Sequence, residues 1–282
     1  MAVTWDRAVV RANLRLGSGL VMLTYVTMHL MSHVTLLISP EWADATITLM
    51  MEPWRTAAGT AVLAAAFLVH YLNALWSIYV RRSLRMPRWE RWQLALGLAI
   101  PLLLTLHVVG TRVAELVHDY HPFYSSTLLT LWYAAPWAGV LQTVALIVVW
   151  VHACLGIHFW LRTKTWYRDW IVAFGVAAVL LPTLALAGFV AAGNDMLREV
   201  AMNPDHAMMT RDMSNATPQS MAFVWQTMQI VIGTHIALVA LAFGARAARG
   251  WLYRRRMPPV LSHASGRKSQ LRPRSGCATS EA

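Results

Sequence analysis

Residues 57–80 read AAGTAVLAAAFLVHYLNALWSIYV and contain no aspartate, glutamate, lysine or arginine. A helix needs about 20 apolar residues to cross the hydrocarbon core of a bilayer, and this run is long enough. Further runs of the same kind lie on both sides of it. The six expected spans are residues 16–38, 57–80, 92–116, 138–161, 171–192 and 222–246.

Composition indicates the same class of protein. The chain of 282 residues is 57% apolar and only 13% charged, whereas soluble domains contain about 25% charged residues. Glu115 is the only acidic residue inside an expected span. We therefore expect an all-α protein, a six-span transmembrane helical bundle. Its parts are a cytoplasmic interfacial segment (1–15), a six-helix membrane domain (16–246) and a basic, disordered cytoplasmic tail (247–282).

The basic residues give the expected orientation. Twenty of the 24 lysines and arginines lie in the N-terminal segment, in the connections 81–91 and 162–168, or in the tail from Arg246. By the positive-inside rule, both termini are then cytoplasmic. The net charge of +11 therefore reflects topology. Because no soluble domain with a basic reading face is expected, the sequence predicts no nucleic-acid partner.

Histidine is the unusual residue of the spans. Seven of the eleven histidines lie inside them, and an ionisable residue within a membrane is a functional hypothesis by default. Counted from the cytoplasmic arginines at about 1.5 Å per residue, His29 and His107 lie about 21–24 Å deep and His70 and His152 about 15–17 Å. The four histidines thus form an outer pair and an inner pair.

Two histidine pairs at two depths predict two bis-histidine haem sites within a four-helix dihaem core. A zinc or copper site would gather its histidines at one level, and a proton relay would include buried carboxylates. His33 shares the face of His29 and is a second candidate for outer ligand, propionate partner or quinone contact. His158 is expected to contact a propionate or lie at the surface, and His235 to be structural.

The segments around these histidines resemble the dihaem cytochrome b anchor of succinate:quinone oxidoreductases. The matching segments are MHLMSH (28–33), FLVHYLNALWSIYV (67–80), LHVVGTRVAE (106–115) and VHACLGIHFW (151–160). In that family the first and third positions hold the outer haem and the second and fourth hold the inner one. The resemblance therefore implies the same pairing, and it implies that quinone reacts at such an anchor.

A closer resemblance is to the six-span membrane domains of certain bacterial class III adenylate cyclases, and it covers roughly residues 11–256. It rests on RLGSGLVMLTYVTMHLMSH (15–33), LWSIYVRRSLRMPRWE (75–90), LGLAIPLLLTLHVVGTR (96–112), ACLGIHFWLRTKTWY (153–167) and LPTLALAGFVAAG (181–193). In that family the anchor is a haem b, quinone-responsive input to an iron–sulfur domain and a cyclase domain. The stretch after Arg256 is too short for either domain, so we expect no catalytic residue here.

The leading expectation is a redox and quinone sensor in the bacterial inner membrane with two haem b groups. Expected partners are the bilayer, quinone or quinol, and a cytoplasmic cyclase or iron–sulfur domain or protein, with a homodimer left open. Quinone oxygens are expected at Arg112 and Glu115, or at Arg15 and Ser18. One alternative is the cytochrome b anchor subunit of a succinate dehydrogenase-like quinone oxidoreductase. A haem-free helical scaffold is the other.

Overall fold

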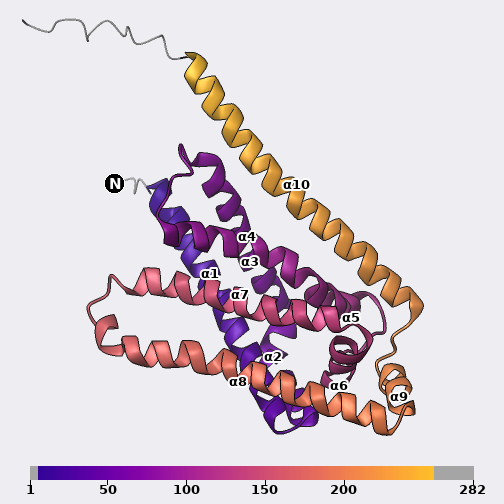
Figure 1. Cartoon of the computed structure of the whole chain (residues 1–282). Helices are drawn as coiled ribbons and strands as arrows, with labels where there is room; N and C mark the ends of the chain where they lie inside the picture. The colour runs from indigo at the N-terminus through magenta and orange to yellow at the C-terminus, as the bar shows by residue number, and fades with distance from the viewer. Residues whose placement is uncertain (1–5, 257–282) are drawn as a thin grey trace, which may run out of the picture.

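The computed structural model describes residues 6–256, and within that range the chain is helical and has no β-strand (Figure 1). The longer helices are α1 (Arg7–Val34), α2 (Pro40–Arg55), α3 (Ala57–Val80), α4 (Arg88–Val108), α7 (Pro136–Leu161), α8 (Tyr167–Met202) and α10 (Pro218–Arg256). The shorter ones are α5 (Ala114–Val117), α6 (Tyr124–Leu128) and α9 (Asp205–Met213). A 3₁₀ turn, η1 (Thr35–Leu37), and two π-helical segments, η2 (Val109–Val113) and η3 (Leu129–Ala134), complete the described chain.

Six of these helical stretches are long and apolar enough to cross a membrane. They are Arg7–Leu37, Ala57–Val80, Arg88–Val117, Pro136–Leu161, Tyr167–Met202 and Pro218–Tyr253. Large apolar side chains on them are exposed, among them Val172, Val179 and Ile230, and contiguous surfaces of this kind indicate contact with lipid. The expected all-α six-span bundle is confirmed, and the architecture is that of a multi-pass membrane protein.

The helices extend beyond the apolar runs that predict them. Residues 7–15 are the first turns of α1 and continue without a break into the first span. Helix α8 ends at Met202, ten residues beyond the expected span, and α9 follows almost at once. Only residues 203–204 and 214–217 of this connection are therefore outside helices. Residues 1–5 and 257–282 of the expected terminal segments lie outside the described residues.

Helix α2 is an addition to the expected architecture. Ser39 caps it by accepting the Trp42 N–H, and Pro40 occupies the first turn, where a missing N–H costs nothing. It was not predicted because its sequence mixes polar and apolar residues and contains no long apolar run. Thr56 then caps α3 through the Gly59 N–H at 3.0 Å, so α2 leads directly into the second span.

The packing order places the histidine-bearing helices next to one another. Helix α1 packs against α3 and α8, and α4 packs against α7. Leu30, Trp150 and Ala185 form one buried cluster that joins α1, α7 and α8. The long helix α10 lies on the outside of the bundle against α3 and α4 (Figure 1). The core around the four predicted ligands is therefore built by α1, α3, α4 and α7.

Candidate functional site

The predicted inner pair comes together between α3 and α7. The ring centroids of His70 and His152 lie 6.2 Å apart, with an angle of 81° between the ring planes. A ligating imidazole nitrogen lies about 2 Å from its metal, so two imidazoles on opposite sides of one iron have centroids about 6 Å apart. The spacing of this pair fits two axial ligands of a single haem iron.

Hydrogen bonds set the orientation of both inner rings. The Nδ1 atom of His70 lies 3.1 Å from the Arg15 carbonyl oxygen and 3.3 Å from Ser18 Oγ, and His152 Nδ1 lies 3.2 Å from the Gln93 carbonyl oxygen. A carbonyl oxygen only accepts, so in the neutral ring Nδ1 carries the hydrogen and Nε2 keeps its lone pair. Metal-ligating histidines are held by the same kind of second contact.

Each inner ring also faces a glycine. A Cβ atom added to Gly97 of α4 would lie 2.9 Å from His152 Cε1, and one added to Gly19 of α1 would lie 3.3 Å from His70 Cε1. The missing side chains let the two imidazole rings lie close to the backbones of α4 and α1. Sequence reasoning missed Gly97. Its signal is a lone glycine among large apolar residues, ten positions before His107.

An open groove of about 820 Å³ lies beside the inner pair, between α1 and α3. Its volume is typical of small-molecule sites, and its wall is apolar except for Asn13 and Ser18. The lining residues are Val10, Asn13, Leu14, Gly17, Ser18, Ala65, Ala66 and Val69. Ser18, a sequence candidate for a quinone contact, thus faces both the groove and the His70 ring.

The predicted outer pair also comes together, but a third histidine joins it. The ring centroids of His29 and His107 are 5.7 Å apart, at an angle of 57°. His33 Nε2 lies 3.2 Å from His29 Nε2, while His29 Nδ1 is buried without a hydrogen-bond partner among the described residues. The outer site therefore has the spacing of an axial pair, with His33 positioned as a second candidate ligand from α1.

His33 is held from the other side by a tyrosine. The Tyr124 hydroxyl lies 2.9 Å from His33 Nδ1 and 3.1 Å from Ser32 Oγ. Burial raises the pKa of Tyr124, so its hydroxyl stays protonated at neutral pH and is available as a donor. Sequence reasoning missed Tyr124 because it lies between two expected spans, and the pattern of apolar residues does not predict where the side chains of a connection lie.

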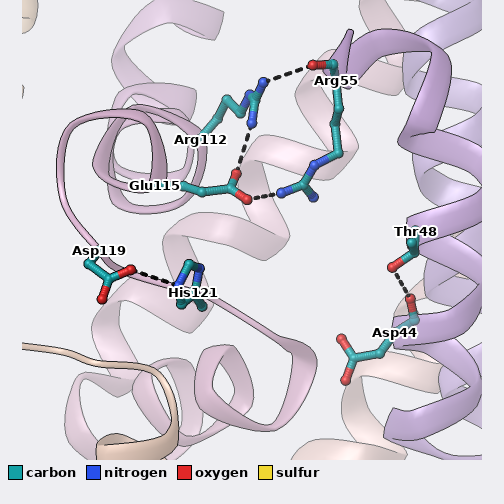
Figure 2. Close-up of polar contacts among 7 residues, drawn as sticks. All are labelled: Asp44, Thr48, Arg55, Arg112, Glu115, Asp119 and His121. Carbon is teal, nitrogen blue, oxygen red and sulfur yellow. Dashed lines mark hydrogen bonds and ion pairs between the residues drawn. The ribbon is translucent and has the colours of Figure 1, made fainter.

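Arg112 and Glu115, the first sequence candidates for a quinone contact, form an ion-pair cluster with Arg55 (Figure 2). Glu115 pairs with both arginines and is 19% exposed, and the Arg112 guanidinium also donates to the Arg55 carbonyl oxygen at 3.4 Å. The cluster fastens the end of α2 to the segment that follows His107. Its charged groups are already paired with one another.

Between this cluster and the outer pair lie two aromatic residues. The Tyr25 ring stacks parallel to His29, with centroids 5.9 Å apart and an interplanar angle of 9°. The Trp54 indole meets Tyr25 edge-on at 5.7 Å, and its buried Nε1 donor has no partner among residues 6–256. An unpaired buried donor beside the outer pair is suited to receive an acceptor oxygen.

The two remaining histidines of the spans have other contacts. His158 Nδ1 lies 3.1 Å from the Tyr167 hydroxyl at the α7–α8 turn. His235 uses both ring nitrogens, with Nδ1 2.8 Å from the Tyr71 hydroxyl and Nε2 3.0 Å from the Leu98 carbonyl oxygen. Because both nitrogens of His235 are engaged, this ring has no position left for a metal.

Residues 6–256 contain no cluster of three or more histidine, cysteine, aspartate or glutamate side chains able to hold a metal ion. A bis-histidine haem takes only two ligands from the protein, so the pairs described above are of a different kind. No family model matches the chain, and no match is found among curated proteins or solved structures. The feature of this chain that points to a function is therefore the geometry of the inner and outer histidine pairs.

Proposed function

We propose that this chain is a membrane-embedded dihaem b anchor that senses the state of the quinone pool and passes it to an adenylate cyclase on the cytoplasmic side. The observation that carries the proposal is the inner pair. His70 and His152 have the spacing of two axial ligands, and a backbone carbonyl holds Nδ1 of each ring so that Nε2 is the nitrogen left to ligate.

The residues have separate tasks in this proposal. His70 and His152 hold the inner haem b, and His29 and His107 hold the outer one, with His33 as the alternative outer ligand. A bound haem supplies one-electron chemistry. The Arg15 and Gln93 carbonyls orient the inner rings, while Gly19 and Gly97 let these rings lie close to the backbones of α1 and α4.

The quinone site belongs on the outer side, beside Tyr25 and Trp54. The Trp54 Nε1 donor is buried and without a partner in the described structure, whereas Arg112 and Glu115 are paired with each other and with Arg55. Trp54 Nε1 would donate a hydrogen bond to a quinone carbonyl oxygen. The Tyr25 ring contacts both Trp54 and His29 and so links the proposed quinone site to the outer pair. Arg112 and Glu115 position Trp54 through the end of α2.

In this proposal both termini lie in the cytoplasm and the membrane is the bacterial cytoplasmic membrane. The distribution of arginine supports this orientation. The Arg246 guanidinium donates to the carbonyl oxygens of Arg81 and Arg82, at 3.1 and 3.3 Å. The basic end of α10 therefore lies beside the arginine-rich connection 81–91, as expected if both face the same side of the membrane.

A reduced-minus-oxidised difference spectrum of the purified chain in detergent tests the proposal. We expect a b-type α-band and two haems per chain by pyridine haemochromogen assay. Anaerobic addition of a quinol should then reduce part of the haem. Absence of an α-band after expression with adequate haem supply would refute the dihaem function and leave the helical scaffold. Copurification with a flavoprotein and an iron–sulfur protein would instead favour the oxidoreductase anchor.

A further inference from the structure

His235 is a buried polar residue on a helix that otherwise faces outwards. Its side chain is 6% exposed, whereas the next residue, Ile236, is 56% exposed. The Leu98 carbonyl oxygen only accepts, so Nε2 of His235 carries the hydrogen and donates it at 3.0 Å. Nδ1 then accepts from the Tyr71 hydroxyl at 2.8 Å. One imidazole of α10 is thus bonded to both α3 and α4.

Both bonds of His235 end next to a residue of the inner site. Tyr71 directly follows His70 on α3, and Leu98 directly follows Gly97, the glycine that faces His152 on α4. Pro101 lies in the next turn of α4 and has no N–H to offer the Gly97 carbonyl. The backbone of α4 is therefore less constrained by its own hydrogen bonds where His235 contacts it.

Few side-chain hydrogen bonds hold α10 to the rest of the bundle, beside a cation–π contact of Arg249 with the Tyr79 ring at 4.7 Å. Among the described side chains of α10, those of His235 and Arg246 make its hydrogen bonds to α3, to α4 and to the connection between them. Beyond these residues α10 continues to Arg256, and Figure 1 shows this end as the part of the helix that projects past the bundle. Apolar side chains such as Val239 and Ala242 also pack against α3 and α4. At the level of His235, however, the hydrogen bonds that join α10 to α3 and α4 come from this one side chain.

We propose that His235 is a positioning residue that couples α10 to the inner histidine pair, so that a change of state at that pair alters the position of the cytoplasmic end of α10. The inference rests on the proposed function for its input, since the inner pair is where the haem is proposed to bind. Hydrogen bonds in a low-dielectric interior are costly to break, so His235 transmits displacement of α3 and α4 to α10. Coupling between two sites requires a structural element whose position depends on the state of both, and the hydrogen-bonded His235 is that element here.

Spin-label distances test the coupling directly. Cys154→Ala and Cys277→Ser provide a cysteine-free background, and Lys164→Cys with Leu252→Cys places one label after α7 and one near the end of α10. The labels are gadolinium(III) chelates, which dithionite does not reduce. The distance distribution between them is measured by double electron–electron resonance in the dithionite-reduced and ferricyanide-oxidised protein. Three versions are compared, namely native His235, His235→Gln and His235→Leu. Glutamine retains one donor and one acceptor, whereas leucine retains only apolar volume.

In both redox states, His235→Leu is expected to broaden or lengthen the distance distribution relative to native His235, and His235→Gln is expected to restore it at least in part. The difference between reduced and oxidised protein should be present with native His235 and lost with leucine, while both versions keep two haems. Tyr71→Phe removes one of the two bonds and should reduce the redox-dependent difference, which provides a second test if His235→Leu does not fold.

The outcomes separate this inference from the proposed function. Two haems with no redox-dependent change in the label distance would overturn the coupling and leave the dihaem proposal standing. A change that persists unaltered in His235→Leu would assign the coupling to another contact. A chain without haem refutes the proposed function and with it the redox input. In that case, a label distance that is the same in native His235 and His235→Leu would also show that His235 does not hold α10 in position.

Discussion

The rings of His70 and His152 lie 6.2 Å apart and belong to α3 and α7, yet each is held by the backbone of a different helix. The Arg15 carbonyl of α1 holds His70, and the Gln93 carbonyl of α4 holds His152. Gln93 also donates its side-chain amide to the His152 carbonyl oxygen at 3.0 Å, so α4 and α7 bond to each other in both directions. All four core helices thus contribute to one histidine pair.

Removing one inner histidine should remove one haem. His70→Ala and His152→Ala are each expected to lower the haem content from two per chain to one, because an iron that loses one of two axial ligands binds weakly. The remaining α-band should be the same in both variants, since both retain His29 and His107. The measurement is a pyridine haemochromogen assay with a difference spectrum. His158→Ala, which alters a contact to Tyr167 at the helix end, is the matched control and should keep two haems.

Gly97 offers a steric test of the same site. Gly97→Val brings side-chain atoms into the space of the His152 ring, where even a Cβ would lie 2.9 Å away. Overpacking of this kind costs about 1–3 kcal/mol, and we expect a lower unfolding temperature together with partial loss of the inner haem. Gly175→Ala is the control, because no neighbouring atom lies within 4 Å of its added Cβ. Equal haem content in Gly97→Val and the native chain would contradict the assigned site.

The sequence predicts the two pairs because depth in a membrane is counted along a helix. Spans are long apolar runs, each histidine has a position within its run, and antiparallel helices bring equal depths together. The proximity of His29 to His107 and of His70 to His152 follows from this counting and agrees with the structure. The role of these residues as haem ligands stays a prediction.

The contacts that orient the rings do not follow from depth. They depend on helix rotation and close approach, and apolar runs specify neither. The Gln93 carbonyl, the Gly97 contact and the Tyr124–His33 bond are of this kind. Helix α2 was missed for a related reason, since it pairs exposed polar residues with a few buried ones such as Ala43 and Met51 and has no long apolar run.

Asp44 should make the outer end of the bundle sensitive to pH. Burial raises the pKa of this carboxyl, although the Tyr124 N–H donates to its Oδ1 at 2.9 Å and opposes the shift. Because the folded-state pKa of Asp44 is higher than its unfolded-state pKa, ionisation of this carboxyl destabilises the fold. The loss begins as the pH rises above the unfolded-state pKa and is complete above the folded-state pKa. Asp44→Asn retains an acceptor for Tyr124 and should therefore raise the unfolding temperature at pH 7. The gain should shrink as the pH falls and vanish below the unfolded-state pKa of about 4, where the acid is protonated in both states.

Thermal unfolding in detergent at pH 7 and at about pH 3, below the unfolded-state pKa, measures this effect. Thr48 bonds the Asp44 backbone carbonyl and not the carboxylate, so its contact is unchanged in the variant (Figure 2). Glu41→Gln is a suitable control because hydrogen bonds to Ser39 and to its own backbone lower the pKa of this exposed carboxyl. That substitution should have the opposite pH dependence. A lower unfolding temperature of Asp44→Asn at pH 7 would show that the carboxylate stabilises the fold.

Glu115 joins the end of α2 to the segment after His107, and its removal should affect both stability and quinol reduction. Glu115→Gln leaves Arg55 and Arg112 without their common anion in a partly buried position. We expect a loss of about 1–2 kcal/mol in the free energy of unfolding, between the values for exposed and buried charged contacts. Because the end of α2 also carries Trp54, the rate of haem reduction by added quinol should fall while haem content stays at two per chain.

Asp195→Asn is the matched control for that substitution. Its pair with Arg198 lies at the far end of α8, with side chains 63% and 75% exposed, and exposed pairs contribute about 0–1 kcal/mol. Stability and the rate of reduction by quinol should both remain near those of the native chain. If Glu115→Gln slows quinol reduction no more than Asp195→Asn does, the ion-pair cluster has no part in the quinone site. The site would then be sought in the groove beside Ser18 and His70.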